Sequence, residues 1–408
     1  MTQPLFAELL RLLRGGVPYR SPFTPRATTT ARGDDLPFKV SMLGPTSVGK
    51  TSLISALLRE AESALIGTKV ILEPYDVETE QRIVTHRRKI EGALYAGEFD
   101  PEAVKPNVEE VIFRLRLATG SDEVGIRFDL LDYPGGWLDP HRRGVENQES
   151  WEECLRFMAQ SSVLIVPIDA VLIMEAQLTK QKQSLPFLLA PGEVRDIALR
   201  WASERAERPD EPALLVFAPT KCESYFADNG GLHDESEKLY NQTTRLYGQV
   251  RTAVMATAPH TKIYYVPVDT LGCVQLISAK WRPNAMFEGT LECLPHFAIR
   301  PPAMLRPKAV DSILFLLCRQ LTEARSRTAD VVAKVSADRA AEAAALADRS
   351  EGLFRDLFLR LIGEKALRER SRDWLAGEAR REMAYLDRLT EVVDKLAEQP
   401  HNDRVRQW

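Results

Sequence analysis

The sequence is poor in cysteine and in long apolar runs. Five cysteines occur in 408 residues, no two form a CxxC pair, and no Cys/His cluster has the spacing of a zinc finger. A disulfide scaffold and a structural zinc site are therefore not expected, and scattered thiols are typical of the reducing cytoplasm. No run of about 18 apolar residues appears, so a membrane-spanning helix is not expected either.

An excess of basic charge is also missing. Lys and Arg number 54 against 58 Asp and Glu, which leaves a formal net charge of −4. This balance gives no reason to expect nucleic acid as a partner. The apolar fraction of 44% and the charged fraction of 27% are typical of a folded globular protein.

Composition divides the chain into three regions. Residues 1–36 contain a short amphipathic stretch near Pro4–Arg14 and then a segment rich in Gly, Pro, Ser and Thr, which predicts a helix followed by a flexible linker. Residues 37–320 alternate short apolar runs with helical patterns. Residues 321–408 are rich in Ala, Leu, Arg and Glu and lack proline before Pro400, which predicts an α-helical C-terminal region.

The middle region is predicted to form an α/β fold. Strands are expected at 40–43, 108–117, 124–132, 162–168, 213–217 and 263–268, and helices at 51–61 and 80–96. Because strands alternate with helices, the sheet should be mostly parallel and covered on both faces, as in the three-layer sandwich of P-loop NTPases. The short connection between 108–117 and 124–132 allows only antiparallel pairing, so one antiparallel edge pair is expected.

The strongest motif is a phosphate-binding loop. Gly44-Pro45-Thr46-Ser47-Val48-Gly49-Lys50-Thr51 fits GxxxxGK[ST] between a predicted strand and a predicted helix. The glycines allow a tight loop with inward-pointing N–H groups, and the helix N-terminus adds partial positive charge. Lys50 can reach the β- and γ-phosphates, and the hydroxyl of Thr51 can bind Mg²⁺. We expect this loop, together with Ser52, to bind a nucleotide.

A second motif ends the strand predicted at 124–132. Asp132 and Gly135 form DxxG, and an acid in this place can hold Mg²⁺ directly or through a water molecule. The N–H of Gly135 can contact the γ-phosphate because glycine lets the backbone approach closely. Lys50, Asp132 and Gly135 are therefore the predicted catalytic residues, and Thr51 and Asp132 are the predicted metal ligands.

Two later segments are predicted to recognise the base. Thr220-Lys221-Cys222-Glu223 stands where guanine-binding GTPases carry [NT]KxD, whose acid accepts hydrogen bonds from guanine N1 and N2. Glu223 is one methylene longer than Asp, which weakens a guanine preference without excluding it, and a surface Lys/Glu pair is the competing interpretation. Asp269, Thr270 and Leu271 follow the last predicted strand and should lie against the base, whereas the triplet Ser278-Ala279-Lys280 lies further along.

In this order, and with an antiparallel strand pair before the second motif, the four segments resemble the translation-factor-related (TRAFAC) class of P-loop GTPases over about residues 38–320. The run Asp132-Tyr133-Pro134-Gly135-Gly136-Trp137-Leu138 is similar to the DYPGEWL run of the bacterial YcjX-like GTPases. The resemblance implies a nucleotide-binding domain with Mg²⁺ and slow GTP hydrolysis.

Two features depart from that pattern. No threonine occurs in residues 105–107, near the place of the threonine that clamps Mg²⁺, although Thr79 and Thr85 lie upstream. Gly136 stands where many GTPases have a glutamine that orients the attacking water. We therefore expect slow turnover, with the missing group supplied by a partner, a second copy or another loop. The nearby basic candidates are His141, Arg142 and Arg143.

The predicted function is a cytoplasmic GTPase switch with GTP or GDP and Mg²⁺ as ligands. Segments 97–110 and 133–150 would become ordered around the γ-phosphate. The alternatives are a nucleotide-holding interaction module with little hydrolysis, an ATP-using P-loop protein, and a membrane-remodelling protein suggested by the apolar stripe at 353–362. The helical C-terminal region is the predicted surface for an effector or a second copy, whereas peripheral membrane contact has weaker support.

Overall fold

The computed structural model describes residues 37–66, 70–96, 98–99, 109–118, 126–229, 233–285, 288–323, 326, 390, 394 and 403–408. The chain forms two units, Met1–Leu36 and Pro37–Trp408, and every described residue belongs to the second. The predicted N-terminal helix and linker therefore lie outside the described residues. So does most of the predicted helical region over 321–408, including the stripe at 353–362.

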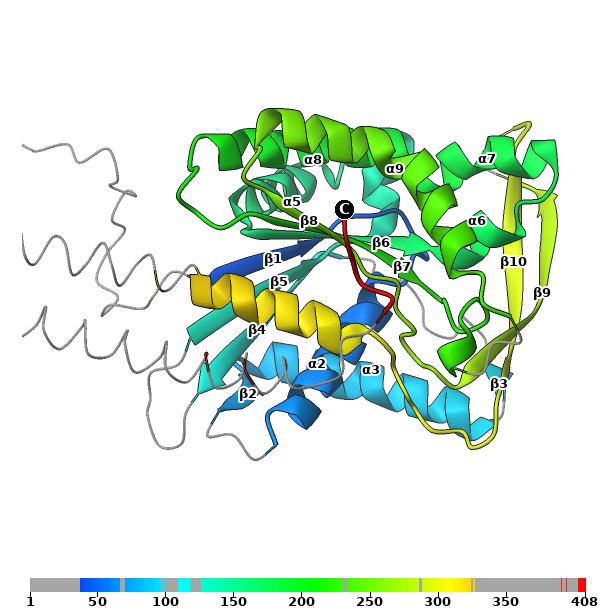
Figure 1. Cartoon of the computed structure of the whole chain (residues 1–408), viewed down its shortest axis with the longest axis horizontal. Helices are drawn as coiled ribbons and strands as arrows, with labels where there is room; N and C mark the ends of the chain where they lie inside the picture. Colours follow the sequence, from blue (N-terminus) through cyan, green and yellow to red (C-terminus); the bar gives the residue numbers. More distant parts are fainter. Residues whose placement is uncertain are drawn as a thin grey trace, which may run out of the picture. The chain divides into compact units, whose positions relative to one another are not determined.

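An eight-stranded sheet forms the centre of the second unit (Figure 1). Its strands in spatial order are β11 (Arg406–Gln407), β8 (Lys262–Tyr265), β7 (Leu214–Thr220), β6 (Val163–Asp169), β1 (Phe38–Met42), β5 (Ile126–Asp132), β4 (Val111–Ala118) and β2 (Ile71–Pro74). The five strands from β8 to β5 are parallel, and β11, β4 and β2 are antiparallel to their neighbours. The predicted α/β class with a mostly parallel sheet is confirmed.

The predicted antiparallel pair corresponds to β4 and β5, which begins with Val111 opposite Asp132. Two further antiparallel strands, β2 and β11, had no signal in the sequence. β2 has four residues and none of them is buried, while β11 has only two residues. Strands this short are too brief to display an alternating apolar pattern, so only their tertiary pairing defines them.

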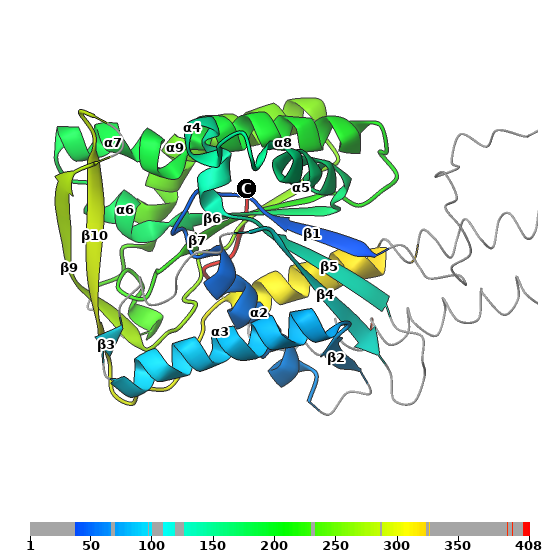
Figure 2. The same cartoon turned by 180° about the vertical axis from the view of Figure 1, so that it is seen from behind.

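Helices cover both faces of the sheet, as the two opposite views show (Figures 1 and 2). One face carries α2 (Lys50–Ala64), α3 (Val77–Ala96) and a helix over 310–323. The other carries α5 (Gln148–Gln160), α8 (Pro191–Ala206) and α9 (Ser236–Thr257), with the shorter α6 (Ala170–Glu175) and α7 (Thr179–Leu189) nearby. Within the described residues, no helix has both the length and the apolar character needed to cross a bilayer.

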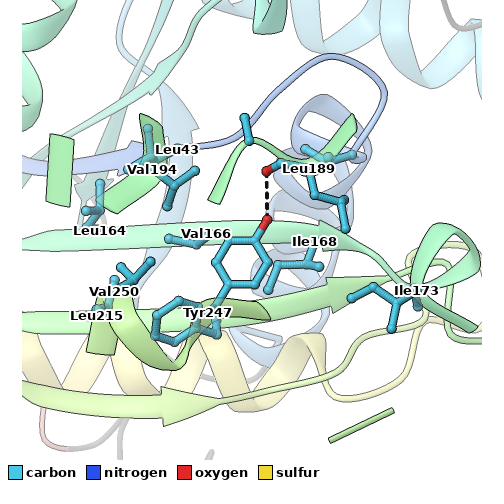
Figure 3. Close-up of a cluster of buried hydrophobic side chains, with 14 of the residues drawn as sticks. Leu43, Leu164, Val166, Ile168, Ile173, Leu189, Val194, Leu215, Tyr247 and Val250 are labelled. Atoms are coloured by element: carbon cyan, nitrogen blue, oxygen red, sulfur yellow. Dashed lines mark hydrogen bonds between the residues drawn. The ribbon is translucent and has the colours of Figure 1, made fainter. Parts of the chain in front are cut away.

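The described residues form two large apolar cores, one on each face of the sheet, and a small third cluster that includes Ala64 and Leu65. Every residue of β6 and β7 is buried, because parallel strands covered on both faces have no solvent-facing side. Tyr247 of α9 lies in one core among leucine, isoleucine and valine side chains (Figure 3). Its hydroxyl donates to the carbonyl oxygen of Leu189 at 2.8 Å, so the buried phenol has a hydrogen-bond partner.

A second, three-stranded sheet lies apart from the first. It contains β3 (Glu98–Phe99), β10 (Leu291–Ile299) and β9 (Val274–Pro283), all antiparallel. The β9–β10 hairpin reaches α7, where the backbone N–H of Leu291 donates to Ser184 Oγ at 2.8 Å. The triplet Ser278-Ala279-Lys280 lies inside β9 rather than in a loop.

The parallel strands all end at one edge of the main sheet, and this edge carries the predicted motifs. The chain leaves β1 for strands on one side and later continues at β6 on the other side, so the strand order switches beside β1. Ligands of open α/β sheets bind outside the carboxyl ends of the strands at such a switch point. Gly44, Asp132, Lys221 and Asp269 all follow or end strands at this edge.

Candidate functional site

The loop between β1 and α2 turns closely at a left-handed glycine. Gly49 has φ 86°, in the left-handed region that glycine tolerates, and a Cβ there would lie 3.1 Å from Thr220 Oγ1. Gly49 is also the N-cap of α2 and provides no side-chain hydrogen bond to the helix. The first N–H groups of α2 are therefore not capped by that side chain and can bind an anion.

Lys50 folds back over this loop. Its Nζ donates to the carbonyl oxygens of Gly44 at 2.8 Å and Pro45 at 2.9 Å. Burial lowers the pKa of Lys50 to about 8, and the nearby Asp132 opposes the shift. The Nζ also lies 4.9 Å from the centre of the Tyr133 ring. A buried ammonium group of this kind gains from an added anion, which would restore its ordinary charge state.

Asp132 ends β5 beside the start of α2. Thr51 Oγ1 donates to Asp132 Oδ2 at 2.6 Å. Burial raises the pKa of Asp132, and both Lys50 and the Thr51 hydrogen bond oppose the shift. The site thus places a hydroxyl and a carboxylate oxygen side by side between the loop and the sheet.

These two oxygens fit Mg²⁺ in the way that nucleotide sites hold it. Mg²⁺ prefers oxygen ligands and is usually bound by one or two carboxylates together with substrate phosphates and water. Among the residues that the structure describes, no group of three or more His, Cys, Asp or Glu side chains could hold a metal by itself. Thr51 and Asp132 are therefore suited to a metal ion that shares its ligands with a phosphate chain.

The segment after Asp132 lies directly on the loop. Gly135 begins a short 3₁₀ helix, η2 (Gly135–Leu138), and a Cβ there would lie 2.4 Å from the backbone of Pro45 and Thr46. Only glycine fits so close an approach. Tyr133 adds a second link, because its hydroxyl accepts from Gly44 N at 3.0 Å and donates to Gly44 O at 3.1 Å. Sequence reasoning assigned Tyr133 no role, although the residue stands in the Asp132–Leu138 run beside Asp132.

The two arginines of the basic turn that follows, Arg142 and Arg143, have different surroundings. In α4 (Pro140–Arg143), Arg143 Nη1 donates to Trp137 O at 3.1 Å, and its guanidinium lies 5.1 Å from the Trp151 ring. Arg142 is exposed, and its Nε lies 3.8 Å from where a Cβ at Gly136 would be. Thr46 Oγ1 lies at the same distance from that point. Arg142 thus lies beside Gly136, the position where many GTPases have a glutamine. Arg143 instead stabilises the turn through its bond to Trp137.

Residues 220 and 221 attach the third motif to the same loop. Thr220 Oγ1 donates to Val48 O at 2.7 Å, and Lys221 Nζ donates to Ser47 O at 2.8 Å. Lys221 also forms an ion pair with Asp169, the buried last residue of β6. Sequence reasoning missed Asp169, although it closes an apolar run in the same way that Asp132 does.

Glu223 is a buried acid with one oxygen to spare, so the alternative of a surface Lys/Glu pair is wrong. Glu223 is 3% exposed. Its Oε1 accepts hydrogen bonds from the backbone N–H groups of Leu271 and Gly272, both at 3.2 Å. Oε2 is buried and has no hydrogen-bond partner within the described part of the chain. Burial, and then the charge of Asp269, raise the pKa of Glu223 to about 7. The free oxygen can accept hydrogen bonds from a ligand.

The predicted base loop lies beside Glu223, but its first residue points inward. Asp269 is fully buried, and its Oδ2 accepts from Asn229 Nδ2 at 2.7 Å and from Arg404 Nη2 at 2.9 Å. The carboxylate of Asp269 is therefore engaged by side chains of the protein interior. Leu271 reaches the acid through its backbone N–H, and Thr270 is also buried.

The threonine expected before the second motif is not located. Residues 105–107 lie outside the described residues. Thr79 is buried on α3, and its hydroxyl accepts from the backbone N–H of Arg114 at 3.1 Å, while Thr85 is exposed on the same helix. Thr79 therefore has a structural contact of its own.

Comparisons with known proteins add little to this geometry. No family model and no curated protein matches the sequence. Among solved structures, the chain is similar to that of Methanosarcina barkeri Roco2 RocCORdC bound to GDP, with a TM-score of 0.24 and 12% sequence identity. The match covers 60% of this chain and 47% of the Roco2 chain, so this chain spans about half the length of the Roco2 chain. The chemistry of the site follows from its own residues.

Proposed function

We propose that the chain is a P-loop GTPase that binds GTP or GDP with Mg²⁺ and hydrolyses GTP slowly as a nucleotide-dependent switch. One observation carries the proposal. Asp132 and Gly135 come from one segment and Thr220 and Lys221 from another, far apart in the sequence, and all four adjoin the loop or the start of α2 through direct contacts. The predicted domain over 37–320 would supply this site, and the region over 321–408 would meet an effector or a second copy.

The phosphate chain would lie along the loop from Gly44 to Ser52. The uncapped N–H groups of α2 and the ammonium of Lys50 supply positive charge in a buried place, where such charge acts most strongly. Lys50 would exchange its bonds with the Gly44 and Pro45 carbonyls for bonds with phosphate oxygens. Thr51 and Asp132 would hold Mg²⁺, which neutralises phosphate charge when it is bound.

Hydrolysis needs the γ-phosphate to be held and charge on it to be stabilised. The N–H of Gly135 is suited to the first task because this residue adjoins Pro45 and Thr46. Gly136 has no side chain to orient water, which supports slow turnover. Arg142 is the side chain of the basic turn that borders Gly136, so we assign it the stabilisation of charge in the transition state.

The base would be recognised by Glu223 and the backbone of residues 269–271. Guanine offers N–H donors at N1 and N2, and Glu223 has a buried oxygen without a partner in the described residues. Adenine offers no donor at N1, so it would leave a buried acceptor unsatisfied, at a cost of about 1–3 kcal/mol. This favours GTP over ATP.

Phosphate release from GTP and Mg²⁺ by the purified full-length chain tests the proposal. Lys50→Ala should lower turnover on the order of a hundredfold or more, because it removes a buried charge at the phosphates. Lys39→Ala is the matched control, since Lys39 lies on the adjoining strand and hydrogen-bonds to Gln160 at 2.6 Å. Equal phosphate release by Lys50→Ala and the wild type would end the proposal. Preference for ATP in a competition assay would select the ATP-using alternative.

A separate test addresses Arg142. Arg142→Ala should lower turnover about tenfold to a hundredfold with GTP affinity nearly unchanged, because the arginine acts on transition-state charge. Arg156→Ala is the control, since Arg156 forms an exposed ion pair with Glu153 on α5. Unchanged turnover in Arg142→Ala would contradict the assignment. Turnover near background in the wild type itself would favour the nucleotide-holding module, which Gly136 also supports.

A further inference from the structure

The last residues of the chain return to the main sheet. β11 pairs with β8 through Arg406 opposite Tyr265, and Figure 1 shows this segment in red beside β8. The backbone N–H of Trp408 donates to Ile263 O at 2.9 Å. The Trp408 ring meets the Phe217 ring edge-on at 4.5 Å. The C-terminus is therefore packed against the strands that lead to the base-recognition segments.

Arg404 enters this region as a buried charge. Its side chain is 3% exposed and forms ion pairs with Asp228 and Asp269. The guanidinium also lies 4.0 Å from the centre of the Phe226 ring. Asp228 belongs to η3 (Ala227–Asn229), which follows the Glu223 segment, and Asp269 begins the base loop. One arginine thus joins both base-side segments.

Asp269 is the point where two remote parts of the chain meet. Its backbone forms a bridge with Lys308, with the two N–H···O distances at 3.0 and 3.2 Å. Lys308 precedes the helix over 310–323, and Arg404 lies near the end of the C-terminal region. Both ends of the segment from 309 to 403 are therefore attached to one residue of the base loop.

The contacts continue from Asp269 to Glu223. Leu271 and Gly272 lie two and three residues after Asp269, and their N–H groups donate to Glu223 Oε1. If Arg404 were withdrawn, Asp269 would be a fully buried carboxylate without its cation. Breaking a buried ion pair on one side is strongly destabilising, so the loop would have to rearrange to hydrate or protonate the acid. Glu223 would then lose its fixed orientation.

We propose that Arg404 is a positioning residue for nucleotide recognition, and that the six residues from Asp403 to Trp408 thereby set how long a nucleotide stays bound. This inference rests on the proposed function. It makes nucleotide release sensitive to anything that displaces the C-terminal strand. Among the described residues, Arg404 contacts Asp228, Asp269 and Phe226, which lie on the base side, so the chemical step on bound GTP should not depend on it.

The test is the dissociation rate of a fluorescent GDP analogue from the full-length chain. Arg404→Gln should release it about tenfold faster or more, because a buried ion pair is broken. Single-turnover hydrolysis of bound GTP should be unchanged, a result that general unfolding would not give. Arg406→Gln is the matched control in the same C-terminal segment, since Arg406 pairs with the exposed Glu237 and its loss should change release by less than about twofold.

Two further variants keep the test decisive if Arg404→Gln does not fold. Arg404→Lys keeps the charge but loses the fork that reaches both acids, so release should be intermediate. Adding Asp269→Asn to Arg404→Gln removes the unpaired charge and should slow release toward that of the wild type. Release from Arg404→Gln, or from Arg404→Lys, at the wild-type rate would overturn the inference but not the proposed function. Failure of the wild type to bind any nucleotide would overturn both.

Discussion

The phosphate side and the base side of the candidate site are built differently. The phosphate side is one contiguous loop that acts through backbone groups and one lysine, and two neighbouring segments are placed on it by hydrogen bonds and close contact. The base side includes buried side chains from three separate segments, namely Glu223, Asp269 and Arg404. Backbone groups need only a local conformation, whereas buried charges need partners brought from elsewhere in the fold.

This difference has consequences for how each side fails. A change on the phosphate side should act on the γ-phosphate or on the chemical step, because the loop geometry is set locally. A change on the base side should act on how tightly the nucleotide is held and on the pH dependence of that binding, because burial raises the pKa of Glu223 to about 7.

The largest effect is expected from Gly135→Ala. The added methyl group would lie 2.4 Å from the backbone of Pro45 and Thr46, so the segment would have to leave the loop. GTP turnover should fall on the order of a hundredfold, while GDP affinity should change little because GDP has no γ-phosphate. Measuring both in parallel shows which side of the site has failed.

Gly92→Ala is the matched control for that change. A Cβ at Gly92 meets nothing within 4 Å, and the residue lies inside α3. We expect normal turnover and a gain in helix stability of about 0.5–1 kcal/mol. Normal GTP turnover in Gly135→Ala, or an equal loss of GTP and GDP affinity, would break the proposed division between the two sides.

A smaller effect is expected from pH on the base side. Guanine N–H groups donate to an ionised carboxylate, and the pKa of Glu223 is about 7 in the free protein. GDP affinity should therefore rise with pH through 7, by about tenfold between pH 6 and pH 8. Dividing by the affinity of Glu223→Gln, which cannot ionise, removes the titration of the nucleotide's own phosphates. A ratio independent of pH would contradict this account.

The same group has the opposite effect on stability. Folding raises the pKa of Glu223 from its ordinary value of 4.5, which means that the folded chain favours the protonated form. Its contribution to the free energy of unfolding is fully present below pH 4.5 and is lost as the pH rises through 7. Base-side stability and GDP affinity should thus move in opposite directions over this range.

The smallest effect is expected from Tyr133→Phe. The change removes the hydroxyl that bonds to Gly44 N and Gly44 O, at a cost of about 1–3 kcal/mol in the free energy of unfolding. Tyr247→Phe is the control, because it removes one equally buried hydrogen bond in the core away from the loop. Urea unfolding should show losses in both variants. Only Tyr133→Phe should lower nucleotide affinity, by a few-fold; equal affinities would exclude a role for Tyr133 in the loop.

Much of the architecture could be predicted because it follows from the local pattern of apolar residues and from the lengths of the connections. The buried runs of β6 and β7 and the short connection before β5 predicted the mostly parallel sheet with its antiparallel pair, and both are confirmed. β2 and β11 could not be predicted, since strands of four and two residues have no readable period. Thr51 beside Asp132 and Gly135 against the loop follow the expected geometry, while their roles in binding and catalysis stay predictions.

Other parts of the site depended on contacts that no pattern encodes. Asp169 beside Lys221, Tyr133 on Gly44 and Arg142 beside Gly136 each involve residues whose partners lie elsewhere in the sequence or across a turn. Asp269 was expected to lie against the base, yet its carboxylate accepts hydrogen bonds from Asn229 and Arg404. An acid at the end of a strand gives the same sequence pattern whether its side chain faces a ligand or the protein interior.

The amino-acid sequence by itself determined the bend from Gly44 to Thr51, because a left-handed glycine, a lysine and a helix start are local properties of the backbone. Only the tertiary structure decided that the chain's final strand would bring Arg404 to Asp269, 135 positions away. A buried charge is tolerated only where the fold places an opposite charge beside it, and that placement depends on the path of the whole chain.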